Sequence, residues 1–159
     1  MGVITGKPQD ITQDVGAIQG ALAGEHAGIA AYRIAGESGL LVPETLKIAQ
    51  LFKSHHEAHR DALAKLVSDI GTTPVEPKGD AEYISELKLD TLHSQAEVLA
   101  LATTLEHIAA TGYISHMSAI RDPGLAQIFA QISADEVIHW TTLNGATGGS
   151  LPADPYAFG

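Results

Sequence analysis

One pattern of charged residues occurs twice in this chain, each time inside an apolar run. The segments LAGEHAGIAAY and TTLEHIAATGY, which lie 81 positions apart, each contain a Glu-His pair and a Tyr seven residues after the Glu. A second match follows at an offset of 80, where His56 and His59 correspond to Glu136 and His139. Matched segments in both halves predict that the chain contains two copies of one helical hairpin.

The first half shows the periodicity of two helices. In its first part, apolar residues follow one another at steps of three and four, which predicts a helix over residues 10–36. Pro43 suits the first turn of a second helix, which we expect over residues 43–71. His56 and His59 lie on the apolar face of that helix, so its buried face becomes polar halfway along.

The second half is predicted to form another hairpin. The Pro- and Gly-containing segment GTTPVEPKGD indicates a long connection, with one irregular helical turn in AEYISELK. A Ser-x-x-Glu capping pattern opens a helix over residues 94–121, and an Asp-Pro pair opens the last helix, over residues 122–144. We therefore predict an all-α four-helix bundle of two antiparallel helical hairpins joined by a long crossover. The bundle would cover residues 11–144, with tails over residues 1–10 and 145–159.

Six polar residues are expected to converge in this bundle. Glu25 and His56 lie at similar distances from the first hairpin turn, and Glu106 and Glu136 lie at similar distances from the second. The helices would therefore bring one set of side chains to the same height in the core: Glu25, His56, His59, Glu106, Glu136 and His139. Three buried carboxylates without cations would each lose hydration on the order of several kcal/mol and would repel one another, so we expect bound metal.

A resemblance to a known family supports this interpretation. The segment Glu136-Val-Ile-His139 is the Glu-x-x-His motif of carboxylate-bridged di-metal bundles, in which one Glu from each of two helices joins a Glu-x-x-His from each of the other two. Over residues 11–144 the chain resembles the ferritin-like superfamily, of the rubrerythrin and bacterioferritin type. The resemblance implies that Glu25 and Glu106 are terminal carboxylate ligands and that Glu136 is a bridging carboxylate. It also implies that His59 and His139 are the two imidazole ligands.

The chain departs from the family pattern on the second helix. His56 occupies the position where the family has its second bridging Glu, so only three carboxylates would face two divalent ions. We expect one bound ion, or two with the second held weakly, as the resemblance to manganese catalases with fewer carboxylates also allows. Glu57 could replace the missing carboxylate if the helix contained a π-bulge. Because Glu57 also stands where haem-binding bacterioferritins have Met, no haem is expected.

Other polar residues have less direct roles in this interpretation. Tyr32 and Tyr113 lie two helical turns beyond the two glutamates and are expected to line the same channel, either near the chemistry or as core residues bonded to a carboxylate. His26 and His107 are expected to contact the ligands from outside or to join helices. Surface or helix-end positions are expected for a further group: His55, His93, His116, Glu57 and Asp135.

Composition excludes several other classes of function. A formal net charge of −10 disfavours nucleic acid as a partner. The absence of Cys excludes disulfides, thiolate metal sites and a built-in rubredoxin-type electron donor, so a peroxidase of this kind would need an external electron donor.

The first residues do not resemble a secretory leader, and we expect a cytoplasmic protein, although a leader removed earlier would leave no trace. We expect no membrane partner and a homo-oligomer of at least two chains.

These observations favour an oxidoreductase that reacts bound iron, or manganese, with dioxygen or peroxide. Zinc and copper also suit a histidine-rich site. Two alternatives stay open. One is a non-catalytic metal-binding or storage protein, and the other is a structural bundle whose metal site is vestigial.

Overall fold

The computed structural model describes the backbone of residues 8–158 and the side chains of residues 12–158. Its elements are α1 (Pro8–Glu37), α2 (Pro43–Asp69), α3 (Asp80–Leu87), the short 3-10 helix η1 (Leu89–Thr91), α4 (Gln95–Met117) and α5 (Pro123–Ala146). No strand occurs in this range. Of the tail expected over residues 1–10, the last three residues belong to α1, and residues 1–7 lie outside the described part of the chain.

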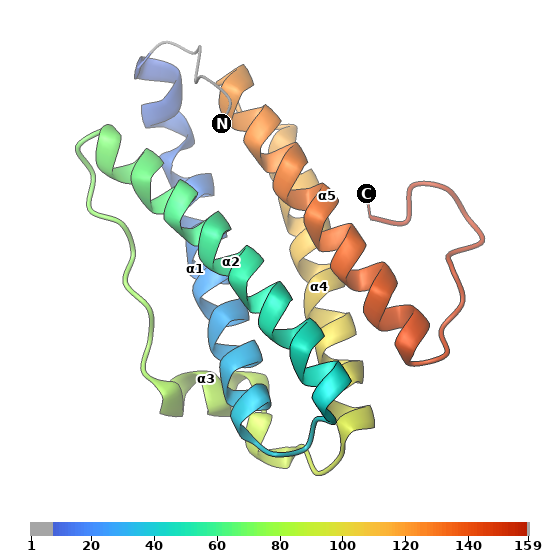
Figure 1. Ribbon diagram of the computed structural model, residues 1–159. Helices are drawn as coiled ribbons and strands as arrows, with labels where there is room; N and C mark the ends of the chain where they lie inside the picture. Colours follow the sequence, from blue (N-terminus) through green and yellow to red (C-terminus); the bar gives the residue numbers. More distant parts are fainter. Residues whose placement is uncertain (1–7, 159) are drawn as a thin grey trace.

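The four long helices form two hairpins that lie side by side (Figure 1). α1 packs antiparallel against α2, and α4 packs antiparallel against α5, while less extensive contacts join α1 to α4 and α2 to α5. The segment between α2 and α3 runs back along the first hairpin, so that α4 starts at the end of the bundle where α2 also starts. The fold is therefore the predicted all-α bundle of two antiparallel hairpins joined by a long crossover.

Short sequence signals set the helix boundaries. Pro43 occupies the first turn of α2, where a backbone N–H would have no helical partner. At the start of α4 the Ser94 hydroxyl accepts a hydrogen bond from the Glu97 N–H at 3.3 Å. The Asp122 carboxylate accepts from the Leu125 N–H at 2.7 Å and caps α5. Both side-chain caps lie where the capping patterns predicted them.

The crossover is attached to α1. The side-chain amide of Gln19 donates to the Thr73 carbonyl at 2.7 Å and accepts from the Val75 N–H at 2.8 Å. His26 Nε2 lies 3.1 Å from the Val75 carbonyl oxygen, so this histidine joins α1 to the crossover. The helical part of the crossover is longer than the single irregular turn expected, because α3 and η1 extend from residue 80 to residue 91.

The main apolar core fills one end of the bundle. It contains residues from all four long helices: Ile18, Leu22, Leu63, Leu66, Val67, Tyr113, Leu125, Phe129 and Ile132. Burying a side chain of this size stabilises the fold by about 1.5–3 kcal/mol. The Asp14 carboxylate accepts from the backbone N–H groups of Arg121 and Asp122, at 2.9 and 3.0 Å, and ties the α4–α5 turn to α1. The polar positions of the four helices lie next to this core, toward the middle of the bundle.

The C-terminal segment folds back beside α5 (Figure 1). α5 itself ends at Ala146, two residues beyond the predicted end. The ring of Phe158 packs against His107 and Trp140, with ring centroids 5.0 and 5.1 Å apart, so the tail docks on the bundle. Tyr156, by contrast, is 91% exposed. Between residues 8 and 158, none of the helices is both long and apolar enough to span a lipid bilayer.

Candidate metal centre

Six ionisable side chains meet in the middle of the bundle and are called the central cluster below. All are buried, with exposed fractions from 0% for Glu136 to 8% for His59. α1 contributes Glu25 and α4 contributes Glu106. The other two helices each contribute two residues spaced by three, His56 and His59 from α2 and Glu136 and His139 from α5. These are the six residues whose convergence was predicted from helical periodicity.

A glycine on α1 allows the close approach of α1 and α2 at the cluster. A Cβ atom added to Gly28 would lie 3.2 Å from Cε1 and Nδ1 of the His56 ring. Such a contact is tighter than ordinary van der Waals packing, so a larger residue would push the imidazole aside. Gly28 therefore helps to hold His56 in the centre of the cluster.

The central cluster divides into two overlapping groups of potential metal ligands. The first group comprises Glu25, His56, His59 and Glu136, and the second comprises His56, Glu106, Glu136 and His139. Within each group, one ligand atom per residue lies within 4.8 Å of the others. His56 and Glu136 belong to both groups and therefore lie between the two candidate ion positions.

The two oxygens of Glu136 face different groups. Glu136 Oε1 lies 3.2 Å from His59 Nδ1, in the first group, and Oε2 lies 3.4 Å from His139 Nδ1, in the second. The His56 ring is also shared, because its Nδ1 lies 2.7 Å from Glu25 Oε2 and its Nε2 lies 3.4 Å from Glu106 Oε1. A carboxylate with one oxygen toward each group has the orientation that a bridging ligand needs.

Several atoms of the cluster lack hydrogen-bond partners. Among the described residues, five such buried atoms face the cluster: His59 Nδ1, His139 Nδ1, Glu106 Oε2 and both carboxylate oxygens of Glu136. These five atoms face one another at 3.2–3.4 Å without forming hydrogen bonds, and such a group of atoms is uncommon in a folded protein. Imidazole nitrogens and carboxylate oxygens are ligands for divalent iron, manganese and zinc. The donor set of the cluster therefore fits a metal ion.

The outward nitrogens of two cluster histidines have partners from neighbouring helices. His59 Nε2, on α2, lies 3.3 Å from the Asp135 carboxylate of α5. His139 Nε2, on α5, lies 2.9 Å from His55 Nδ1 of α2, and the two rings stack with centroids 5.2 Å apart. Such partners fix the orientation of a histidine so that its other nitrogen faces the ion.

The contacts of His55 and Asp135 were not predicted. His55 was expected at a surface or helix end, yet it is half-buried and contacts a cluster histidine. Asp135 does lie on a solvated face, with its side chain 50% exposed, but it also reaches His59. The available signal was their position, since each directly precedes a cluster residue on its helix.

Two tyrosines connect the glutamates across the bundle. The Tyr32 hydroxyl, on α1, donates to Glu106 Oε1 on α4, and the Tyr113 hydroxyl, on α4, donates to Glu25 Oε1 on α1. Burial and the adjacent carboxylates raise the pKa of both phenols well above the usual value, so both remain protonated donors. Each tyrosine holds one oxygen of a glutamate and leaves the other oxygen facing the cluster.

Charge pairing determines the protonation state of the metal-free cluster. Burial alone would raise the pKa of Glu25, but hydrogen bonds and charges from His56 and His59 outweigh it and lower this pKa to about 2. Burial would likewise lower the pKa of His59, but Glu136 and Glu25 raise it to about 10. The pKa of His56 is also raised, because its hydrogen bonds to Glu106 and Glu25 outweigh burial. Without metal, protonated His56 and His59 therefore pair with ionised Glu25, whereas burial raises the pKa of Glu136.

Other candidate residues lie outside the cluster. Glu57 pairs with Lys53 at 2.6 Å, and α2 is a regular α-helix at this point, so the alternative of a π-bulge that brings Glu57 inward is wrong. His26 contacts the crossover, and His107 packs against the C-terminal segment. His93 is exposed, as expected.

Comparisons with known proteins agree with this fold. A family model described as a ferritin-like domain matches residues 13–149. The structure is similar to a conserved hypothetical protein, rv2844, from Mycobacterium tuberculosis, with a TM-score of 0.76 and 22% identity over 92% of this chain and 99% of that one. It is also similar to ferritin-like, diiron-carboxylate proteins from Bacillus anthracis str. Ames, with a TM-score of 0.72 and 19% identity over 87% and 97% of the two chains. No curated protein matches the sequence.

Proposed function

The chain belongs to the ferritin-like domain family, and from this premise we propose that it binds one or two metal ions in the central cluster for oxidoreductase chemistry with dioxygen or peroxide. The observation that carries the proposal is the orientation of Glu136, whose two oxygens make no hydrogen bond and face the two groups of ligands. Iron is the proposed metal, with manganese or zinc as alternatives. The Bacillus anthracis proteins of similar fold are described as diiron-carboxylate proteins, which supports iron.

The residues of the cluster have separate roles in this proposal. Glu25 with His59 would hold one ion, Glu106 with His139 would hold the other, and Glu136 would contact both. When bound, iron or manganese would supply the one-electron redox chemistry that dioxygen and peroxide require. His56 places one ring nitrogen in each group but adds no negative charge, so the second ion would be held more weakly than the first.

The surrounding residues hold the ligands and exclude water. The two tyrosine hydroxyls hold the outer oxygens of Glu25 and Glu106, and the outward nitrogens of His59 and His139 are held from the opposite helix. The apolar core closes the cluster at one end of the bundle. Ligands that are already oriented lose little conformational freedom when the metal binds.

Metal analysis of protein purified without chelator tests the proposal. We expect between one and two equivalents of iron or manganese per chain and a higher melting temperature than after chelator treatment, because an ion that binds only the folded chain stabilises it. Consumption of peroxide without added reductant would indicate dismutation, and dependence on a reductant would indicate a peroxidase. A chain that contains no metal as purified and shows no thermal shift with Fe²⁺, Mn²⁺ or Zn²⁺ would contradict the proposal.

Metal binding is also expected to release protons. At pH 7, His56 and His59 carry protons in the metal-free cluster because the adjacent glutamates raise the pKa of both, whereas a ligand imidazole must be neutral. We expect on the order of two protons released per chain, and an apparent metal affinity that falls as the pH is lowered from 8 to 6. Calorimetric titration in buffers with different ionisation enthalpies measures the proton count. Binding without proton release would show that these histidines are not ligands.

A further inference from the structure

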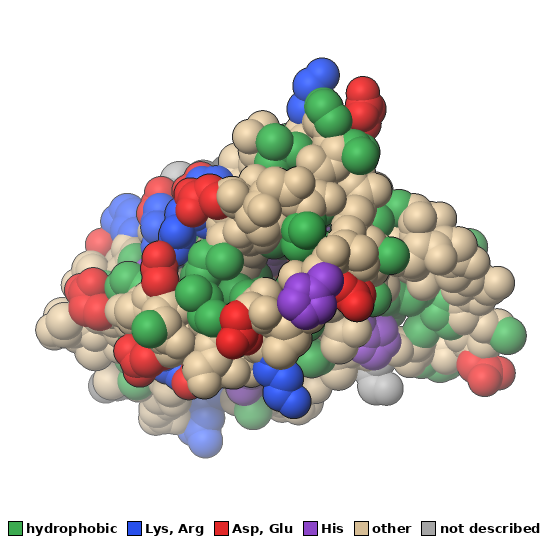
Figure 2. Space-filling model, turned by 90° about the horizontal axis from the view of Figure 1, so that it is seen from below, with side chains coloured by type: hydrophobic (Ala, Val, Ile, Leu, Met, Phe, Trp, Pro, Cys, Tyr) green, Lys and Arg blue, Asp and Glu red, His purple; other side chains and the backbone are tan. Residues whose placement is uncertain are grey.

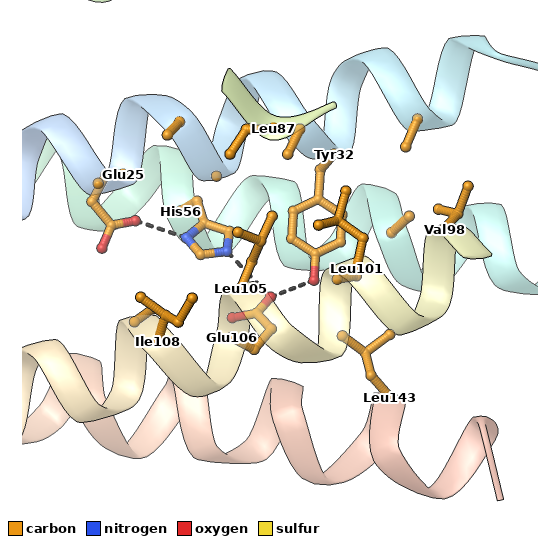
Figure 3. Close-up of a pocket in the computed structure, with 18 of the residues that line it drawn as sticks. Glu25, Tyr32, His56, Leu87, Val98, Leu101, Leu105, Glu106, Ile108 and Leu143 are labelled. Atoms are coloured by element: carbon orange, nitrogen blue, oxygen red, sulfur yellow. Dashed lines mark hydrogen bonds and ion pairs between the residues drawn. The ribbon is translucent and has the colours of Figure 1, made fainter. Parts of the chain in front are cut away.

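An apolar cleft between α1 and α4 leads to the central cluster (Figure 3). Its volume is about 360 Å³, which falls within the range of small-molecule sites in proteins. The wall on α1 consists mostly of glycine and alanine, and the wall on α4 carries larger side chains, among them Leu101, Leu105 and Ile108. Leu87 and Leu89, from α3 and η1, also line the cleft. Figure 2 shows the end of the bundle at which α3 lies, and hydrophobic side chains are visible near the centre of this view.

The width of the cleft follows from the small residues on its walls. Gly20 and Gly24 on α1 and Gly112 on α4 all line it, and a Cβ atom added to any of them would meet no other atom within 4 Å. Ile108 at the rim is 60% exposed, so the cleft is open to solvent. The space beside α1 is therefore real and accessible.

Most ionisable groups of the cleft are at its inner end, where His56 already contacts both Glu25 and Glu106. Glu25, Tyr32, His56, Glu106 and Tyr113 contribute to the lining, and no residue that lines the cleft is Lys or Arg. Tyr32 and His56 are visible next to the two glutamates in Figure 3. A carboxylate or phosphate group would meet two glutamates and would find no free cation, because both nitrogens of His56 are already paired with Glu25 and Glu106. The lining therefore suits a neutral molecule.

We propose that the cleft binds an uncharged, linear alkyl molecule with its polar end at the central cluster. At roughly 30 Å³ per water-sized group, the volume accommodates about 8–12 carbon atoms. If the bound molecule is a substrate, that role rests on the proposed metal-dependent function. Binding of the molecule in the cleft does not depend on the metal. A helix from a second copy is a poorer occupant, because the inner end of the cleft is formed by buried cluster residues that a helix cannot contact.

Calorimetric titration with primary alcohols tests the proposal on the full chain, both as purified and after chelator treatment. Hexan-1-ol, octan-1-ol and decan-1-ol should bind with one site per chain, and the affinity should rise by about threefold to fourfold for each added methylene. Decanoate should bind chelator-treated protein at least tenfold more weakly than decan-1-ol. No saturable binding of decan-1-ol, or equal binding of decanoate, would overturn the proposal. Because chelated protein is used, failure of metal binding would not obscure this result.

Matched leucine substitutions locate the site. Gly24→Leu and Gly112→Leu place side chains in the cleft, whereas Gly16→Leu makes the same change on α1 where no cleft residue is affected. Leucine has a higher helix propensity than glycine, so all three variants should keep the helical fold. At least one cleft variant should lose tenfold or more in affinity for decan-1-ol, with Gly16→Leu unchanged.

Two results of this comparison would overturn the proposal. One is an equal loss in all three variants, or no loss in either cleft variant. The other is that the parent is a dimer that does not bind decan-1-ol and that Gly24→Leu dissociates this dimer. That result would show that a second copy of the chain covers the cleft.

Discussion

Glu136→Gln is expected to reduce the affinity for the first metal ion at least about 100-fold and to abolish binding of a second. Loss of an outer-shell partner alone typically lowers metal affinity 10- to 100-fold, and Glu136 is a member of both ligand groups. The substitution preserves the size of the side chain but leaves two carboxylates to neutralise the metal charge. Calorimetric titration with Fe²⁺ under anaerobic conditions, or with Mn²⁺, measures the change.

The metal-free form of this variant provides an internal check on folding. Burial raises the pKa of Glu136, which means that the ionised carboxylate is unfavourable at its position without a cation. The melting temperature of metal-free Glu136→Gln should therefore be unchanged or higher, while the rise in melting temperature on adding metal disappears. Glu57→Gln is the matched control, because Glu57 pairs with Lys53 on the outside of α2. If both variants bind metal as the parent does, the central cluster is not the metal site.

His56→Glu should have the opposite effect and raise the metal content toward two ions per chain. Two divalent ions bring four positive charges, whereas the cluster of the parent contains three carboxylates, of which only Glu136 belongs to both groups. A glutamate at position 56 would add the missing anion at the other position shared by the two groups. Any peroxide-consuming or iron-oxidising activity should rise with the second ion.

Calorimetry and elemental analysis of the parent, His56→Glu and His93→Glu decide this prediction. His93 is exposed just before α4, so His93→Glu makes the same substitution on the surface without altering the cluster. Only His56→Glu should bind the additional ion. If it binds no more metal than the parent, position 56 is not a bridging position and the di-metal interpretation of the cluster must be abandoned.

Helical periodicity was sufficient to predict which residues enter the core. Each cluster residue lies at a step of three or four from apolar neighbours, and distances from the hairpin turns placed Glu25 beside His56, as their 2.7 Å contact shows. Capping patterns likewise located the starts of α4 and α5. These properties depend on positions within one helix or one hairpin, so a single sequence contains them.

Contacts between hairpins could not be predicted in this way. The pairing of His55 with His139 and of Asp135 with His59 depends on how α2 and α5 are rotated toward each other, and both residues lie beside the apolar face of their helices. His26 illustrates the same limit, because its neighbour Val75 lies on a crossover whose path no periodic pattern specifies.

The sequence alone determined the four helices, the starts of α4 and α5 and the six ionisable residues that face the core, because these follow from local periodicity and capping; α4 ends at Met117, four residues before its predicted end. Only the tertiary structure decided that the two oxygens of Glu136 face different ligand groups, since this depends on the relative positions of all four helices. It also decided that an apolar cleft reaches the cluster between α1 and α4. Small residues such as Gly24 are compatible with either tight helix packing or an open space, and the distance between the two hairpins determines which of the two occurs.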